Sequence, residues 1–325
     1  MHSVLKFSAW MGVGVVAAVL GCGGSVSVGG GIGGGGVSVG AGTGGFGMAM
    51  GVDEHRRDVE DWYAKRVERL KSENGWLTLV GLFPLAEGRH DFGSASDNEL
   101  VFPASAPAHA GTIVVENGAP RLEAQPGSGL TMKGAPVDAI DLATDENGAP
   151  TEIALGTITF YVIDRPGSLY LRVKDTANPL RESFTGIDRF KVDRDWVVAA
   201  HLERYDPPKQ LTVPNVIGFD EIVDCPGVLT FKLGGKKYSL EPMSESEEDI
   251  WIVFGDASNG RDTYGGGRFV YIPAPDAEGN TTIDFNKSYN PPCVFTPYAT
   301  CPLPIRENVL PIRIEAGEKM WGEDH

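Results

Sequence analysis

Short segments in which apolar and polar residues alternate make up most of the sequence after Gly75. Turn signals separate them, for example the Asn117-Gly118 and Gly234-Gly235 pairs. A period of two is typical of strands that bury one face, and such Gly-containing pairs favour tight hairpin turns. The chain is therefore predicted to be mainly β, with antiparallel hairpins that form sandwiches or partly open barrels. The expected strands are 77–83, 99–102, 112–116, 153–163, 169–173, 196–205, 228–233, 238–242, 250–254, 268–273, 281–285 and 310–315.

One helix is expected ahead of the strands, within residues 52–75. Its apolar residues recur at helical spacing and the other face is filled by Arg and Glu. Asn74 and Gly75 then favour its termination. The apolar stripe consists of Val59, Trp62, Tyr63, Val67 and Leu70.

The first 22 residues resemble a lipoprotein signal peptide. Lys6 precedes an apolar run over residues 9–20, which is too short to span a bilayer comfortably. Gly21-Cys22 follows and resembles the lipobox of bacterial lipoproteins, in which the cysteine becomes the lipid-modified first residue. The alternative is an ordinary signal peptide that is cleaved nearby. The expected location is the cell envelope, lipid-anchored on the periplasmic side or at the cell surface.

Residues 23–51 contain no charged residue and consist almost entirely of Gly, Ser, Val and Ala. Such a composition cannot bury a core, so this segment is predicted to be a disordered tether. A tether after a lipidated Cys22 would hold the folded part away from the membrane.

The formal net charge is -16, from 28 basic and 44 acidic residues. Nucleic acids and anionic lipid surfaces attract basic proteins, so the charge argues against both as partners. The only membrane contact that we expect is the lipid anchor.

Residues 85–167 contain the motifs Glu87-Gly-Arg-His-Asp-Phe-Gly93, Asp97-Asn-Glu-Leu-Val-Phe-Pro103 and Leu155-Gly-Thr-Ile-Thr-Phe160. This succession of short strands and turns resembles a forkhead-associated (FHA) domain, and the expected domain covers 76–178. The FHA family reads phosphothreonine with an arginine after the first glycine and a serine ahead of the histidine. Ser94 and Ala106 or Pro107 occupy those places here. Without a guanidinium to pair with a phosphate, phosphopeptide binding is not expected.

A broader set of motifs runs from Val59 to the carboxy terminus. They are Trp76-Leu-Thr-Leu-Val-Gly-Leu-Phe-Pro-Leu85, Phe92-Gly93, Leu171-Arg-Val-Lys-Asp175, Phe190-Lys-Val-Asp193, Phe254-Gly-Asp256, Tyr264-Gly-Gly-Gly-Arg-Phe269, Asp284-Phe-Asn-Lys287, Pro291 to Pro304 and Ala316-Gly-Glu-Lys319. They resemble a bacterial family called domain of unknown function 1684, and this resemblance implies no activity. A second β domain is expected over 179–325.

Residues 291–304 are rich in proline and contain Cys293 and Cys301. Proline excludes a regular helix or a central strand, so a rigid loop is expected. In an exported protein, a Cys293–Cys301 disulfide would close this loop and stabilise it by about 2 to 3 kcal/mol. The alternative is a metal site that includes Cys225 or His201, but the usual ligand spacings are absent. No metal or cofactor is predicted.

Polar residues near the carboxy terminus are the candidate ligand-binding residues, because turns and strand ends commonly carry binding sites. They are Asp256, Tyr264, Arg268, Asp284, Asn286, Lys287, Asn290, Asn308, Glu318 and Lys319. The structural alternative is that Asp284 pairs with Arg268, and Glu318 with Lys287 or Lys319, to hold the loop.

Two functions remain compatible with these residues. The preferred one is a lipid-anchored envelope protein with a ligand-binding or structural β domain, whose ligand is small and polar. The alternative is a hydrolase that acts on a small polar or saccharide-like substrate through the same cluster, with Asp284 or Asp256 as general base. Gly127-Ser128-Gly129 lacks the flanking residues of a nucleophile elbow, so no catalytic set is assigned.

Overall fold

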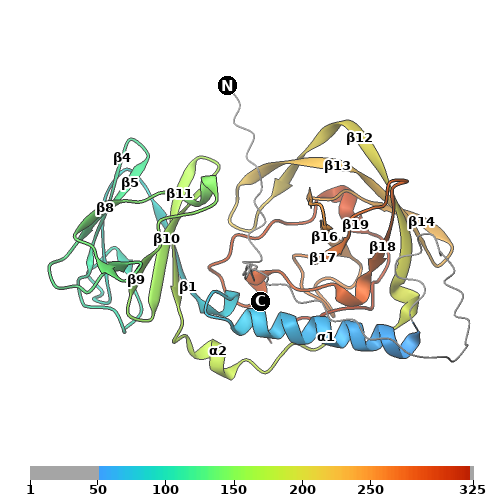
Figure 1. The fold of residues 1–325 in the computed structure, drawn as a ribbon, viewed down its shortest axis with the longest axis horizontal. Coiled ribbons are helices and arrows are strands. Elements are labelled where there is room, and N and C mark those ends of the chain that lie inside the picture. Colours follow the sequence, from blue (N-terminus) through green and yellow to red (C-terminus); the bar gives the residue numbers. More distant parts are fainter. Residues whose placement is uncertain (1–50, 323–325) are drawn as a thin grey trace, which may run out of the picture.

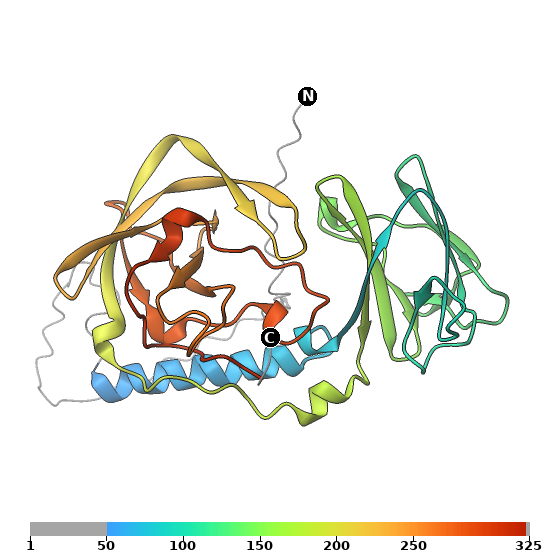
Figure 2. The same ribbon diagram turned by 180° about the vertical axis from the view of Figure 1, so that it is seen from behind.

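The computed structural model describes residues 51–322, which form two β domains and a long helix that runs along the second domain (Figures 1 and 2). The mainly β fold that the sequence predicts is confirmed. The expected signal peptide, the lipidated Cys22 and nearly all of the tether lie outside the described residues. Between residues 51 and 322, no helix is both long and apolar enough to cross a membrane.

The first domain is a sandwich of two sheets. Its larger sheet has the order β1 (Leu79–Leu85), β11 (Ser168–Asp175), β10 (Ile158–Arg165), β9 (Ile153–Leu155), β6 (Thr131–Met132) and β7 (Ala135–Pro136). The facing sheet has the order β3 (Leu100–Val101), β2 (Gly88–Gly93), β4 (Gly111–Glu116), β5 (Ala119–Ala124) and β8 (Ala139–Asp141). The rings of Phe92, Phe102 and Phe160 meet between the sheets at centroid distances of 5.0 to 5.4 Å. Contacts between aromatic rings at such distances contribute beyond the apolar area that they bury.

The second domain is built around two long strands, β12 (Val197–Pro214) and β13 (Asp220–Leu233), which pair with each other along nearly their whole length. Their sheet has the order β14 (Lys236–Leu240), β13, β12 and β18 (Asn280–Asp284). A register shift between Arg204 and Lys209 interrupts the pairing of β12 with β13. Such an irregularity bends a strand and increases its local twist. The hairpin therefore wraps around the second sheet of the domain (Figure 1).

The second sheet of this domain contains β15 (Ser244–Glu245), β16 (Asp249–Asp256) and β17 (Arg268–Pro273), and β19 (Val309–Leu310) pairs with β16 in parallel. Ile250, Ile252 and Phe254 of β16 face one apolar core, whereas Trp251 and Val253 face another. A strand that is buried on both faces reads as a continuous apolar run, as residues 250–254 do.

Helix α1 (Val52–Lys71) confirms the predicted helix, but its buried face is not purely apolar. Val59 and Leu70 are buried as expected, and so are His55 and Arg66. A charged side chain is seldom buried unless it is paired, so partners on the second domain are implied. A short helix, α2 (Pro179–Ser183), lies on the connection between the two domains.

Short 3-10 turns complete the fold and position several of the polar residues discussed below. They are η1 (Trp76–Thr78), η2 (Asp145–Asn147), η3 (Arg194–Trp196), η4 (Phe285–Lys287), η5 (Pro292–Val294) and η6 (Arg306–Asn308).

Candidate functional site

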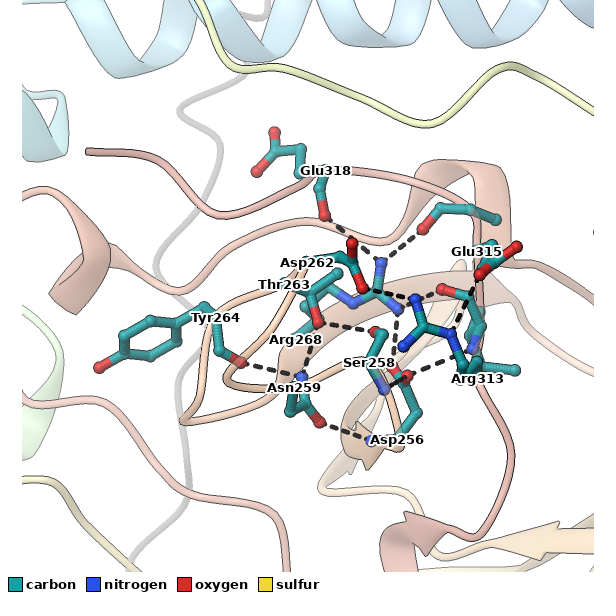
Figure 3. A network of polar contacts seen from close by, with 12 residues as sticks. Asp256, Ser258, Asn259, Asp262, Thr263, Tyr264, Arg268, Arg313, Glu315 and Glu318 are labelled. Carbon is teal, nitrogen blue, oxygen red and sulfur yellow. Dashed lines mark hydrogen bonds and ion pairs between the residues drawn. The ribbon is translucent and has the colours of Figure 1, made fainter. Parts of the chain in front are cut away.

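Arg268, one of the predicted ligand-binding residues, lies at the centre of a buried polar network (Figure 3). Its guanidinium, which is 0% exposed, donates a 2.7 Å hydrogen bond to Asp256 Oδ2 and a 2.9 Å bond to the carbonyl of Ile314. It also donates to the carbonyl of Ala316. The predicted partner, Asp284, was therefore wrong: Asp256 is nearer because β16 and β17 are hydrogen-bonded neighbours.

The carboxylate of Asp256 is fully engaged. Its Oδ1 atom accepts hydrogen bonds from the backbone N–H groups of Ser258 at 2.7 Å and Ile314 at 3.2 Å, while Oδ2 binds Arg268. A buried ion pair with its remaining lone pairs satisfied fixes a structure, and neither partner is available to a ligand. Asp256 and Arg268 hold the segment from Ile314 to Glu318 against β16 and β17.

Glu318 is also fully buried and joins the carboxy-terminal segment to helix α1. It forms an ion pair with Arg66, and its Oε2 atom accepts a 2.7 Å hydrogen bond from the backbone N–H of Asn290. Arg66 also donates to the carbonyl of Asn290 at 2.9 Å and lies over the ring of Tyr289, 4.4 Å from its centroid. The Asn290 side chain donates to the carbonyl of Lys319 at 2.7 Å. The predicted pairing of Glu318 with Lys287 or Lys319 was wrong, because Arg66 on α1 takes this place.

Asp284, at the end of β18, connects the start of α1 to the second domain. Its Oδ2 atom lies 2.9 Å from His55 Nε2, and its Oδ1 atom accepts two bonds from Asn286, at 3.0 Å from the backbone and 2.8 Å from the side chain. The Asn286 side chain in turn bonds both backbone groups of Asp193 at 3.0 and 2.8 Å. Lys287 pairs with Asp58 on α1 at 2.6 Å.

The remaining predicted residues lie apart from one another. Asn308 is buried and joins the segment after β14 to β16 by bonding the backbone N–H and carbonyl of Glu241, at 2.7 and 2.8 Å, and the carbonyl of Val253 at 2.9 Å. The Lys319 ammonium lies 5.0 Å from the ring centroid of Phe190. Tyr264 lies beside Cys293. The structure thus brings the ten candidates into several supporting networks and not into one binding pocket.

A hollow of about 530 Å³ lies beside these networks, at the amino-terminal end of α1. We call it the α1 groove. It is lined by Val52, His55, Arg56, Phe190, Lys191, Val192, Asp193, Arg194, Trp196 and Glu315. A second hollow of about 370 Å³ continues along α1 and shares Arg56, Phe190, Lys191 and Val192 with the first. Ligand pockets typically have volumes in this range.

Two exposed cations, Arg56 and Lys191, stand where the two hollows meet. Neither forms an ion pair with any residue between 51 and 322. The other charged groups of the lining are more engaged: Arg189 pairs with Glu60 at 2.8 Å, and Glu315 binds Arg313 at 3.0 Å. A pair of free cations in a hollow is a suitable place for an anionic group.

His55 lines the groove but serves as a support for it. Its residue is 5% exposed, Nε2 is held by Asp284, and Nδ1 is buried without a hydrogen-bond partner among the described residues. A general base must reach the proton that it removes, and neither ring nitrogen is open to the groove. His55 and Asp284 therefore fix the start of α1, so that Arg56 is held at the groove.

Sequence reasoning did not identify the groove. Helical spacing places Arg56 on the solvated face of the helix, and Lys191 has no local signal beyond its place in the Phe190–Asp193 motif. The Phe190-Lys191-Val192-Asp193 motif was a signal for this segment, but nothing in it showed that α1 packs beside it. This contact depends on the buried pairs that α1 makes with residues 284–290 and 318.

The three described cysteines, Cys225, Cys293 and Cys301, are free thiols in the structure. The predicted disulfide between Cys293 and Cys301 is therefore not formed, although the backbone N–H of Cys293 lies 3.2 Å from Cys301 Sγ. Over residues 51–322, no group of three or more His, Cys, Asp or Glu side chains is arranged to hold a metal ion.

The second domain carries a family match. Residues 182–319 match the model of the family described as protein of unknown function (DUF1684). The match covers β12 to β19 and the networks around Arg268 and Glu318, whereas the resemblance read from the sequence also included α1 and the first domain. The DUF1684 match confirms the family predicted for this region and assigns it no activity.

Two solved structures are similar to parts of the chain. A protein from gene locus rrnAC0354 of Haloarcula marismortui is 27% identical; the match covers 43% of this chain and 78% of that one, with a TM-score of 0.36. A structure from a study of phosphothreonine-dependent FHA domain interactions is 20% identical; that match covers 30% of this chain and 96% of the other, with a TM-score of 0.21. A structure from an FHA study is thus among the neighbours, and it says nothing about ligands here. No curated protein matches the chain.

Proposed function

We propose that this protein is a lipid-anchored binding protein of the cell envelope, and that its ligand is a small anionic molecule held in the α1 groove. The apolar run over residues 9–20, Cys22 and the charge-free segment 23–51 support the anchor and the tether. The groove supports the ligand class. Arg56 and Lys191 carry this part of the proposal, because they are exposed cations without ion-pair partners among the described residues, in a protein whose net charge is -16.

The surroundings of the groove are suited to binding. The wall contains Trp196 and Phe190 beside the two cations, so it offers apolar contact together with charge-assisted hydrogen bonds. The floor is held by His55, Asp284 and Asn286, whose hydrogen bonds are 2.8 to 3.0 Å long. Because these side chains are already held in place, a ligand can bind without a large entropic cost of ordering them.

Hydrolysis is the weaker candidate, because its proposed bases are already engaged. Asp256 is closed off by Arg268 and two backbone donors, and both oxygens of Asp284 accept bonds from His55 and Asn286. A general base needs a lone pair within reach of the substrate proton. We therefore place binding ahead of hydrolysis.

We also propose that Cys293 and Cys301 become bridged once the protein is exported. The separation of 3.2 Å between the Cys293 nitrogen and Cys301 Sγ supports this, because it places the Cys301 sulfur beside the backbone of Cys293. Compartments outside the cytosol permit such a bond.

The ligand class can be tested by titrating the full chain, purified in detergent, with matched pairs of probes: glucose 6-phosphate against glucose, and galacturonate against galactose. We expect only the anionic member of a pair to bind. Arg56→Gln should weaken that binding about tenfold or more, because a hydrogen bond to a charged group contributes about 1.5 to 3 kcal/mol.

Arg57→Gln is the matched control, since Arg57 is exposed on the same turn of α1 and is not among the residues that line the groove. Equal binding of charged and neutral probes, or equal weakening by the two substitutions, would contradict the proposal.

A further inference from the structure

The loop from Pro292 to Cys301 contains a thiol pair in which the two members differ in environment. Cys293 lies in η5 and is half-buried, whereas Cys301, eight residues later, is 2% exposed. The backbone N–H of Cys293 points at the Cys301 sulfur at 3.2 Å. Cys293 is therefore nearer to solvent than Cys301.

Two groups beside Cys293 act on the pKa of its thiol. They are the Cys301 thiol and the Tyr264 hydroxyl. Tyr264 follows a tight turn that Ser258 and Asn259 hold through bonds to Thr263 at 2.8 and 3.0 Å (Figure 3). A further bond of 2.9 Å from Asn259 to the Tyr264 carbonyl fixes the backbone of the tyrosine. The Tyr264 hydroxyl is therefore positioned by a rigid part of the fold.

These contacts separate the acidities of the two thiols. The hydrogen bond from Cys301, assisted by the one from Tyr264, holds the pKa of Cys293 below its ordinary value although burial opposes this. Burial raises the pKa of Cys301 well above the usual value, and the charge of Cys293 adds to this, while Arg172 acts in the opposite sense. A thiolate is the reactive form of cysteine, so the first thiol to react should be Cys293.

Cys225 is a natural reference within the same domain. Burial raises its pKa to about 11, and its thiol donates a 3.0 Å hydrogen bond to the carbonyl of Gly227. It is 0% exposed, and within residues 51–322 neither a second thiol nor a hydroxyl acts on its pKa. Cys225 has the environment of an inert structural cysteine.

We infer that Cys293 and Cys301 form a thiol–disulfide exchange site, in which Cys293 attacks the disulfide of an exchange partner and Cys301 resolves the mixed disulfide. This inference rests on the proposed bridge and goes further, since it assigns the attacking and the resolving thiol.

The exchange proceeds in two balanced steps. The Cys293 thiolate attacks one sulfur of the partner disulfide, so that a bond between Cys293 and this sulfur forms and the other partner sulfur leaves as a thiolate. Cys301 then transfers its proton to the departed thiolate and attacks Cys293, which releases the second partner thiolate. The two protein thiols are oxidised to a disulfide, and the partner disulfide is reduced to its two thiol components.

Oxidation of Cys293 and Cys301 to a disulfide would affect the place where this loop contacts both domains. The carbonyl of Cys301 accepts a 3.0 Å bond from the backbone of Val216, at the end of the β12–β13 hairpin. Next to it, the Thr300 hydroxyl accepts a 3.0 Å bond from Arg172 of the first domain. The loop therefore touches both the hairpin and the sandwich, and the bridge would lock this meeting point.

The attacking thiol can be identified with the reduced full chain in detergent, alkylated by iodoacetamide over a range of pH and analysed by peptide mapping. We expect Cys293 to be labelled at least tenfold faster than Cys301 or Cys225 at pH 7. Tyr264→Phe should shift the pH–rate profile of Cys293 upwards by removing a donor to the thiolate, while thermal unfolding stays cooperative.

The resolving thiol can be identified with oxidised glutathione as the exchange partner. The wild-type chain should lose two hydrogens in mass, and Cys301→Ala should instead retain one glutathione on Cys293. Cys293→Ala should take up none, and Cys225→Ser should behave like the wild type.

Each contrary outcome has a distinct meaning. Glutathione on Cys301 in the Cys293→Ala variant, at the wild-type rate, would overturn the assignment of the attacking thiol and leave the bridge itself standing. Failure of the wild type to form any bridge would overturn both the proposed disulfide and the exchange site. Stoichiometric metal that protects both thiols of the reduced chain from iodoacetamide would replace the exchange site by a metal site.

Discussion

The two β domains are stabilised by different means. The first encloses an apolar core between its sheets, and its Arg–carboxylate pairs on β2, β5 and β8, such as Arg89 with Glu123 and Arg121 with Asp141, have exposed side chains. The second has apolar cores as well, but it also buries Arg268 with Asp256 and Arg66 with Glu318. Exposed pairs contribute little to stability, whereas a buried charge that loses its partner is strongly destabilising. The same residue types therefore have different roles in the two domains.

The largest effect is expected from Arg268→Ala. It leaves Asp256 buried and unpaired, which should lower the free energy of unfolding of the second domain by about 3 to 5 kcal/mol. All the described tryptophans lie outside residues 79–175, so tryptophan fluorescence during urea unfolding follows the second domain. Arg121→Ala in the first domain is the matched control. Its unfolding is followed by far-ultraviolet circular dichroism, because no tryptophan lies within residues 79–175, and the expected change is below about 1 kcal/mol. A similar loss in both variants would remove the distinction between the domains.

A second prediction concerns the attachment of α1. Arg66→Ala removes the partner of Glu318 and the bond to the Asn290 carbonyl, so residues 52–71 should exchange their amide hydrogens faster than in the wild type. We expect a loss of about 2 to 4 kcal/mol in the stability of the second domain. Lys65→Ala, on the exposed face of the same helix, should leave hydrogen exchange unchanged. Unaltered exchange in Arg66→Ala would mean that apolar contacts alone hold α1.

The smallest effect is a pH dependence of the first domain. Burial lowers the pKa of His90, but hydrogen bonds to the Ala86 carbonyl and Glu99 outweigh it, so the pKa is raised in the folded state. The stabilisation is therefore fully present below the unfolded pKa of about 6.5 and is lost as the pH rises through the folded value. Because Glu99 is exposed, we expect the free energy of unfolding of the first domain to change by about 0.5 kcal/mol or less over this pH range. Hydrogen exchange of β2 at pH 5.5 and 8.5 should reveal it, and His90→Gln should abolish it.

Local pattern predicted the elements but not their lengths. The helix over 52–71 and the apolar strand over 250–254 were found because a period of 3.6 and a run of β-branched and aromatic residues are local properties. The expected strands over 196–205 and 228–233 are only parts of β12 and β13. Pro207 and Pro208 indicate a break, yet the strand continues past them because the pairing shifts register between Arg204 and Lys209.

The candidate site shows the same division. The polar residues predicted near the carboxy terminus organise the second domain, but the ion-pair partners predicted for them are wrong. Asp284 pairs with His55, and Glu318 with Arg66, across sequence separations of 229 and 252 residues. No local pattern encodes a contact over such a distance.

The sequence by itself determined the mainly β class, the long helix over 52–71 and the similarity of residues 182–319 to the DUF1684 family, because each depends on neighbours along the chain. The tertiary structure alone decided which charges are buried as pairs and which remain free. Arg66 and Arg56 belong to the same helix, yet one closes a buried ion pair and the other faces the groove. The difference arises from the face of α1 that packs on the second domain, where burial makes an unpaired charge costly and so enforces pairing.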